Sequence, residues 1–225
     1  MFTLHSHRAS FATLFNTLYK FPPSTIHPMK LLVVVAVFPA LASAFDYYLL
    51  SQSWQPTFCK TGNYPGCRNP SPFMKTSLTI HGLWPDNDDG SYPSFCSNTP
   101  LTPSDINAVG VSTLQQYWPD VKTGGTTFLS NEWLKHGTCS GLNGAAYLQA
   151  AVNTEKSIGT SSVISKSVGK SVSAALIQAS YGKRVSLQCS GGALSEVRSC
   201  WDLSFNQIDC GDVGTCKGNV KITSF

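Results

Sequence analysis

The sequence predicts a single α+β domain in which helices pack on an antiparallel sheet and four disulfides crosslink the chain. Three observations support this class. The 225 residues are 42% hydrophobic and only 12% charged, which suits one domain with a sizeable core. Strand-like and helix-like segments follow one another without regular alternation, which favours α+β. The eight cysteines form an even number, and in an exported chain that number is typical of four disulfides.

An export signal is predicted near the N-terminus. From Met29 the chain reads MKLLVVVAVFPALASAFDYY, with a lysine, an apolar run and the tripeptide ASA. This order matches a signal peptide, and the apolar run is shorter than the roughly 20 residues that span a bilayer. We therefore expect residues 1–44 to be an N-terminal extension plus signal, cleaved after Ala44, and residues 45–225 to be the mature domain. Residues 1–28 contain no acid, and both a natural start at Met29 and an organelle address remain open.

Loss of the N-terminal segment nearly cancels the net charge. The whole chain has 16 Lys and Arg against 12 Asp and Glu, and Arg8, Lys20 and Lys30 precede the expected cleavage site. The remaining 13 basic and 12 acidic residues leave a net charge of +1. The composition therefore gives no sign of a broad nucleic-acid-binding surface, and affinity for phosphate has to come from a local site.

Short periodic segments predict the strands. Residues 46–54 and 77–84 alternate in the way of strands, and the second places Ile80 on one face and His81 on the other. Further short strands are predicted near the C-terminus, at residues 184–189, 194–201 and 219–225.

Three helices are predicted between these strands. The first covers residues 101–119, where Thr102 suits the cap and Pro103 suits the first turn. Its apolar side would comprise Ile106, Val109, Thr113 and Tyr117. The second is expected over residues 128–139 and the third from Ala145 to about Ile158. The serine-rich residues 157–173 indicate a loop that gives way to a helix near Ala174.

The segment NEWLKHGTC concentrates three titratable groups in a chain that is poor in charge. On a helix over residues 128–139, Glu132, Lys135 and His136 fall at i, i+3 and i+4 and share one face. A solvated helix face is the simplest explanation, but the neighbouring aromatic and leucine residues indicate a partly buried helix. Cys139 is expected to tie this helix to another segment.

A second group of chemically capable residues lies in TIHGLWPDNDDGSYP. His81 stands at the end of a predicted strand, before a turn that carries Trp84, Asp86 and Tyr92. After residue 44 the chain contains only two histidines, His81 and His136. Because histidine titrates near neutrality, two histidines from separate segments suit paired acid–base catalysis.

These two segments resemble the active-site segments of the ribonuclease T2 family. LTIHGLWPDN and FLSNEWLKHGTCS match its HGLWP and EWxKHGTC motifs in order, and SWQPTFC, LQQYWP and LSEVRSCWD extend the likeness over the mature chain. The resemblance implies an endoribonuclease that needs neither metal nor cofactor. It implies that single-stranded RNA is cut by transphosphorylation to a 2′,3′-cyclic phosphate. DNA lacks the attacking 2′-hydroxyl and would not be cleaved.

The resemblance also implies a role for each matching residue. His136 matches the general base, and His81 matches the general acid. Glu132 and Lys135 match the pair that stabilises the pentacovalent phosphorane. The residues expected at a first base site are Trp84, Asp86 and Tyr92, and those expected at a second are Gln52 and Phe128.

Asn131 departs from the family pattern. Many members have a histidine directly before the glutamate, where it helps to hold the phosphate. Asparagine can donate a hydrogen bond to phosphate but cannot carry a positive charge. We therefore expect Asn131 to affect substrate binding more than proton transfer.

The cysteine pairing is likewise implied by the family and not by the sequence alone, since eight cysteines allow 105 pairings. The implied disulfides are Cys59–Cys67, Cys96–Cys139, Cys189–Cys216 and Cys200–Cys210. The second would join the loop after His81 to the helix that carries His136.

Three other interpretations remain open. His81, Glu132 and His136 could bind zinc together with a cysteine. Cys139 and His136 could form a Cys–His hydrolase. The chain could also be an inactive storage or recognition protein. We expect a monomer without stable membrane association after signal removal, either secreted or held in a vacuole-like or lysosome-like compartment.

Overall fold

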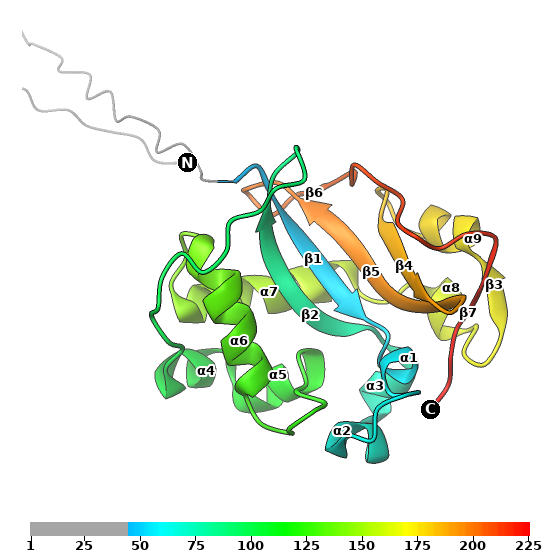
Figure 1. Ribbon diagram of the computed structural model, residues 1–225, viewed down its shortest axis with the longest axis horizontal. Coiled ribbons are helices and arrows are strands. Elements are labelled where there is room, and N and C mark those ends of the chain that lie inside the picture. The colour runs from blue at the N-terminus through cyan, green and yellow to red at the C-terminus, as the bar shows by residue number, and fades with distance from the viewer. Residues whose placement is uncertain (1–44) are drawn as a thin grey trace, which may run out of the picture. The chain divides into compact units, whose positions relative to one another are not determined.

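The computed structural model describes residues 45–225 (Figure 1). The predicted signal peptide and its cleavage after Ala44 lie outside the described residues. Within residues 45–225, strands and mostly short helices form one compact unit, which confirms the α+β class. None of the helices in this range is long and apolar enough to cross a membrane.

A mixed sheet forms the centre of the fold. Its main path runs β2 (Thr79–Asp86), β1 (Tyr47–Ser53), β5 (Ala193–Trp201), β7 (Asn219–Lys221) and β3 (Ser171–Ser173), and β4 (Ser186–Ser190) and β6 (Gln207–Ile208) also pair with β5. The strand pairs are antiparallel, as expected, apart from β5 with β7. The chain after β6 runs beside β4, where Gly214 pairs in parallel with Leu187. Further along the chain, β7 pairs in parallel with β5 through Lys221 and Ala193.

Two hydrophobic clusters pack against the sheet. Leu50 packs with Ile80 and Leu83, and helix α7 (Gly144–Ile158) closes this cluster with Tyr147 and Leu148. Trp54 belongs to the second cluster, which lies between β4, β5 and the helices α8 (Ser162–Ser165) and α9 (Ala174–Ala179). Between the two clusters, β1 separates β2 from β5 in the sheet (Figure 1).

The predicted helix over residues 101–119 is two helices, α4 (Pro103–Val109) and α5 (Val111–Tyr117). Thr102 caps α4 as expected, and its hydroxyl and the Asp105 carboxylate form a reciprocal capping box. The break falls at Gly110, whose φ of +97° lies outside the helical region and suits only glycine well.

The helix with the NEWLKHGTC motif, α6 (Thr127–Lys135), is shorter than predicted and continues as a 3₁₀ turn, η1 (Gly137–Cys139). A side chain from the preceding loop caps its start: Asp120 Oδ2 accepts a hydrogen bond from the Phe128 N–H at 2.9 Å. Leu129 and Trp133 lie one helical turn apart and bury this face of α6 in the core.

The serine-rich stretch contains more regular structure than the predicted loop, namely α8 and β3 before α9. Short helices that the sequence analysis did not predict, α1 (Gln55–Phe58), α2 (Pro65–Arg68) and α3 (Pro72–Thr76), each carry a proline in their first turn. The four disulfides are Cys59–Cys67, Cys96–Cys139, Cys189–Cys216 and Cys200–Cys210, the same pairs that the family resemblance implies.

Candidate active site

A β-bulge sets the position of His81. Ser51 pairs with Gly82 and Gln52 pairs with Ile80, so His81 is the extra residue on β2. Its free carbonyl accepts a hydrogen bond from the Trp118 indole at 3.1 Å. Because of the bulge, the His81 side chain does not follow the regular alternation of β2, and it is 33% exposed.

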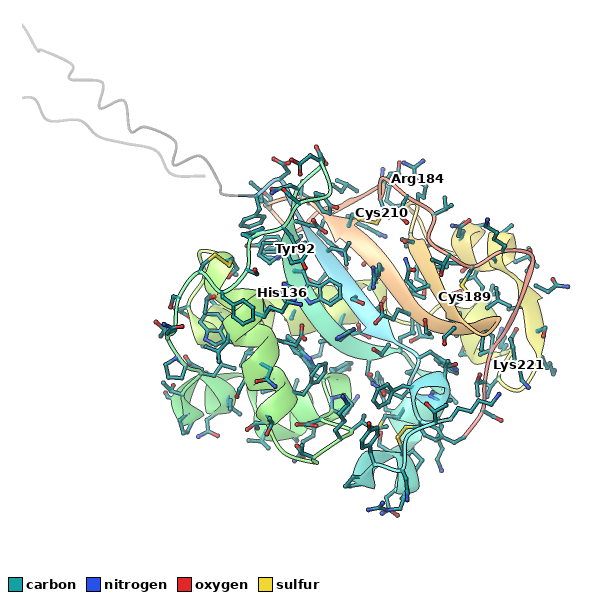
Figure 2. The ribbon with its side chains drawn as sticks, in the orientation of Figure 1. Tyr92, His136, Arg184, Cys189, Cys210 and Lys221 are labelled. Atoms are coloured by element: carbon teal, nitrogen blue, oxygen red, sulfur yellow. A yellow bond between two sulfur atoms is a disulfide. The ribbon has the colours of Figure 1, made fainter. Side chains whose placement is uncertain are left out.

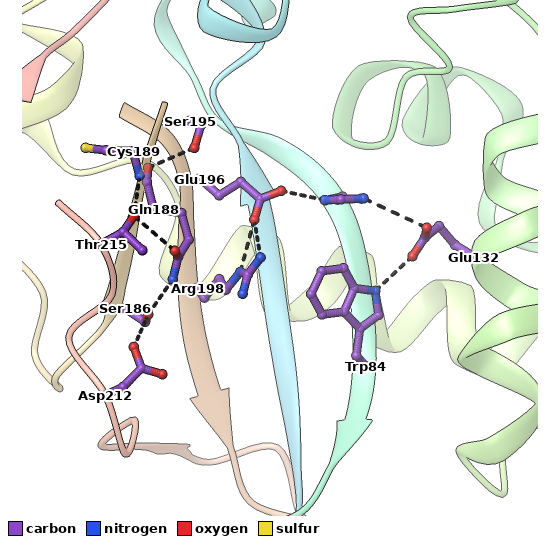
Figure 3. A network of polar contacts seen from close by, with 11 residues as sticks. Trp84, Glu132, Ser186, Gln188, Cys189, Ser195, Glu196, Arg198, Asp212 and Thr215 are labelled. Atoms are coloured by element: carbon purple, nitrogen blue, oxygen red, sulfur yellow. Dashed lines mark hydrogen bonds and ion pairs between the residues drawn. The ribbon is translucent and has the colours of Figure 1, made fainter. Parts of the chain in front are cut away.

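Two carboxylates flank the His81 ring (Figure 3). Nδ1 lies 2.6 Å from Glu196 Oε1 on β5, and Nε2 lies 3.9 Å from Glu132 Oε1 on α6. The first distance is a strong hydrogen bond, and the second is a looser ionic contact. Each ring nitrogen of His81 thus faces a carboxylate oxygen.

Glu132 connects the His81 segment to α6. Its Oε2 accepts a hydrogen bond from the Trp84 indole at 2.8 Å. Burial raises the pKa of Glu132, while the bond from Trp84 and the charges of His81 and Lys135 oppose this rise. The close contact between Trp84 and Glu132 requires a glycine at position 82, because a Cβ there would overlap the Trp84 nitrogen and Glu132 Oε2.

His136 has a very different environment from His81. It ends α6, is 5% exposed, and stacks on Trp84 with ring centroids 5.1 Å apart and planes at 28°. Among the described residues its buried Nδ1 has no hydrogen-bond partner. Burial, followed by the positive charges of Lys135 and His81, lowers the pKa of His136 to about 4. The neutral ring therefore dominates at ordinary pH.

A disulfide and an aromatic ring tie the loop after β2 to the end of α6. Cys96–Cys139 joins the two segments, and the Phe95 N–H donates to the Lys135 carbonyl at 2.9 Å. Tyr92, which is 54% exposed, lies 6.1 Å from the His136 ring and 5.9 Å from the Lys135 ammonium group (Figure 2). Tyr92 therefore lies close to both His136 and Lys135.

A groove of about 390 Å³ extends from His81. Phe128 and Asn131 line it, and the Phe128 ring lies 5.6 Å from the His81 ring. The remaining lining residues are Ser53, Gln55, Phe58, Pro119, Asp120, Val121, Lys122, Thr123, Thr127 and Glu196. The groove combines an aromatic wall with polar groups next to His81, which suits a base and its sugar-phosphate.

Gln52 does not fit the base-binding role expected of it. It is fully buried, and its amide donates to Glu155 Oε2 at 2.8 Å inside the core. The residues of β1 from Tyr48 to Gln52 are all buried, and the Gln52 side chain points towards α7. Asp86 lies at the end of β2, where it accepts a hydrogen bond from the Asn87 N–H at 2.9 Å. Contact of Asp86 with a base remains a prediction.

Glu196 and Arg198 also lie at the site, although neither was predicted from the sequence. Arg198 binds Glu196 Oε2 through Nε at 3.0 Å and Nη2 at 2.7 Å. The signal was present, because these are the only charged residues in the predicted strand at residues 194–201 and they flank the buried Val197. Two charges at i and i+2 on an otherwise uncharged strand share one face and indicate a partner there.

The disulfide of Cys139 argues against two of the other interpretations, the Cys–His hydrolase and the zinc site. Cys139 is bonded to Cys96, so it offers no thiolate for a Cys–His hydrolase or for a zinc site with His81, Glu132 and His136. Within the described residues, no group of three His, Cys, Asp or Glu side chains is arranged to hold a metal.

Known proteins resemble this chain in sequence and in fold. The Ribonuclease T2 family model matches residues 45–210. Ribonuclease DdI of Dictyostelium discoideum is 34% identical over 200 residues, which cover 80% of this chain and 85% of that protein. Extracellular ribonuclease LE of Solanum lycopersicum is 36% identical over 146 residues, which cover 60% of this chain and 61% of that protein. The structure of ribonuclease MC1 from bitter gourd seeds superimposes with a TM-score of 0.68 at 29% identity, covering 79% of this chain and 100% of that one. With the family model matched over most of the described residues and both motif segments in one site, the chain belongs to the Ribonuclease T2 family.

Proposed function

We propose that this protein is an endoribonuclease that cleaves single-stranded RNA by transphosphorylation. The main support for this proposal is the difference between the environments of the two histidines next to Trp84. His81 faces two carboxylates, and His136 stacks on an indole beside a lysine. A general base must be neutral to accept a proton, which fits buried His136, and His81 between the two carboxylates is then the acid.

The reaction divides between the two rings. Neutral His136 takes the proton of the 2′-hydroxyl through Nε2, because its Nδ1 is buried. The 2′-oxygen attacks phosphorus and the bond from phosphorus to the 5′-oxygen breaks. His81 donates the Nε2 proton to the departing oxygen. The products are a 2′,3′-cyclic phosphate and a 5′-hydroxyl end.

Charge develops on the non-bridging phosphate oxygens during the attack. The Lys135 ammonium group is the cation assigned to these oxygens, and Glu132 holds Trp84 and His81 in place from α6. Phe128 and Asn131 line the groove beside His81 and would contact the nucleotide held there. The exposed ring of Tyr92 offers a surface on which another base can stack.

This division of labour needs no metal, since both protons and the developing charge have protein partners. The four disulfides favour an oxidising compartment, so we propose a route through the secretory pathway. The relatives include ribonucleases named as extracellular and as intracellular, so both a secreted and a retained protein fit.

The test is RNA cleavage in excess chelator, with detection of cyclic phosphate ends. We expect cleavage of single-stranded RNA and none of DNA with the same sequence. His81→Ala and His136→Ala should each lose roughly 10²–10⁴-fold in kcat. Asp88→Asn, an exposed carboxylate on the loop after β2, is the control and should keep normal turnover. Intact RNA with the folded wild-type protein would favour the storage or recognition role instead.

A further inference from the structure

Strand β5 presents a charged pair to His81. Glu196 and Arg198 occupy alternate positions on β5 and share one face, while Val197 between them is buried in the core. Ser53 on β1 pairs with Glu196 and Ser51 pairs with Arg198. The β2 bulge turns His81 across β1 towards this pair, although 115 residues separate His81 from Glu196 in the sequence.

The two oxygens of the Glu196 carboxylate bind different partners. Oε1 accepts the His81 Nδ1–H at 2.6 Å, while Oε2 accepts both Arg198 bonds at 3.0 Å and 2.7 Å. The side chain is only 16% exposed, so the carboxylate cannot rotate freely into water. Arg198 therefore fixes Glu196, and Glu196 fixes one nitrogen of His81 (Figure 3).

The contacts close into a ring of five side chains. His81 also contacts Glu132, which accepts the Trp84 indole, and the Arg198 guanidinium lies 5.4 Å from the Trp84 ring centroid. The five residues come from β2, β5 and α6, three elements that are distant in the sequence. A closed ring restrains His81 from two sides, which a single hydrogen bond would not do.

We propose that Glu196 is a positioning residue for His81, holding the proton of that imidazole on Nδ1 and directing Nε2 towards the substrate, with Arg198 as its support. This rests on the proposed function, in which His81 is the acid. With Nδ1–H committed to Glu196, the transferable proton is the one on Nε2, the nitrogen that faces Glu132 Oε1.

The charge of Glu196 persists at every pH where the enzyme would work. Burial alone would raise its pKa, but the bond from His81 and the charges of His81 and Arg198 outweigh burial and lower that pKa to about 2. The other charged or titratable groups near His81 are Glu132 and Lys135 on α6, His136 after it, and Asp120 and Lys122 on the groove wall. Of all these groups, Glu196 makes the shortest contact with the imidazole.

The first measurement is imidazole NMR of the folded protein, independent of any activity. The nitrogen and proton signals of His81 are assigned by their loss in His81→Ala. In the wild type we expect a slowly exchanging proton on Nδ1. In Glu196→Ala this proton should exchange rapidly with water and the neutral ring should populate both tautomers. Unchanged His81 signals in Glu196→Ala would overturn the proposal, whether or not the protein cleaves RNA.

The second measurement is a pH profile of kcat and KM on a dinucleotide. Glu196→Ala should lower kcat by roughly 10–100-fold with little change in KM. Glu196→Gln keeps an acceptor oxygen but removes the charge, so the alkaline limb of its profile should move to lower pH. Glu196→Asp, which keeps the charge, should recover part of kcat. A Glu196→Gln profile that coincides with the wild type would refute the proposal.

Asp212→Asn is the matched control. Asp212 accepts a hydrogen bond from Ser186 on the neighbouring strand β4 and does not belong to the ring around His81 (Figure 3). Circular dichroism of each variant establishes that it is folded. A wild-type protein without RNA cleavage would overturn the proposed function, while the NMR measurement would still decide the part assigned to Glu196.

Discussion

Glu155→Gln should stabilise the protein, and increasingly so as the pH rises. Glu155 lies on α7, is 1% exposed, and accepts the Gln52 amide at 2.8 Å. Burial, opposed only by this hydrogen bond, raises its pKa from 4.5 to about 8. Between those values the folded protein keeps a proton that the unfolded chain releases, so the wild type loses stability as the pH rises.

The magnitude follows from the difference between the two pKa values. Each pH unit in this window costs roughly 1.4 kcal/mol, so the loss between pH 4.5 and pH 8 is on the order of 5 kcal/mol. Glutamine has the same shape and no proton to lose. Its amide can also donate to the buried Gln52 Oε1, which has no partner among the described residues. The stabilisation should therefore be near zero at pH 4.5 and should approach that value at pH 8.

The assay is urea unfolding with the disulfides intact, followed by tryptophan fluorescence at pH 4.5, 6 and 8. The quantity of interest is the free energy of unfolding of Glu155→Gln minus that of the wild type, in which the titration of all other groups cancels. Asp88→Asn removes an exposed carboxylate and should give a small, nearly constant difference. A Glu155→Gln difference that stays flat or falls from pH 4.5 to pH 8 would show that Glu155 is not a buried neutral acid.

Three further predictions concern the site. The general base must be neutral, and the pKa of His136 is lowered to about 4. On acidification, kcat/KM should therefore fall only near pH 4. A pH–rate profile whose acid limb lies near 6.5 would contradict this prediction. Asn131→His should lower KM at acidic pH, where the new imidazole is charged, and leave kcat nearly unchanged; equal KM values at pH 5 would mean that Asn131 does not touch the phosphate. Gly82→Ala should push Trp84 away from Glu132 and reduce kcat by about tenfold or more. Circular dichroism checks that the variant is folded. Normal turnover of the folded variant would show that the contact between Trp84 and Glu132 is not needed.

Much of the fold was predictable because its signals are local. Strands form around His81 and over residues 194–201, where they were predicted, although the bulge at His81 interrupts the alternation. Helix α7 begins one residue from the predicted Ala145 and ends at Ile158 as predicted. Thr102 and Pro103 marked the start of α4 correctly, since capping is a contact between residues three apart. The short proline-initiated helices and the break at Gly110 were missed because one residue decides each of them.

In the site, too, relations between residues close in the sequence were predictable and long-range contacts were not. The spacing within NEWLKHGTC placed Glu132, Lys135 and His136 together on one helical turn, and the bond from the His136 N–H to the Glu132 carbonyl at 2.9 Å keeps them so. No local pattern could show that Gln52 turns into the core, since it stands beside other strand residues and its partner Glu155 is 103 residues away.

The sequence by itself therefore determined which chemical groups the protein has and which of them share a helix or strand, because those relations depend on the backbone period alone. Only the tertiary structure decided how the groups differ. The two histidines are chemically identical residues, and the charged partners of one and the aromatic partner of the other come from strand pairing, a bulge and helix packing across the whole domain. Hydrogen bonds, stacking and burial act between groups in contact, so the surroundings of each ring depend on neighbours that are close in space and distant in sequence.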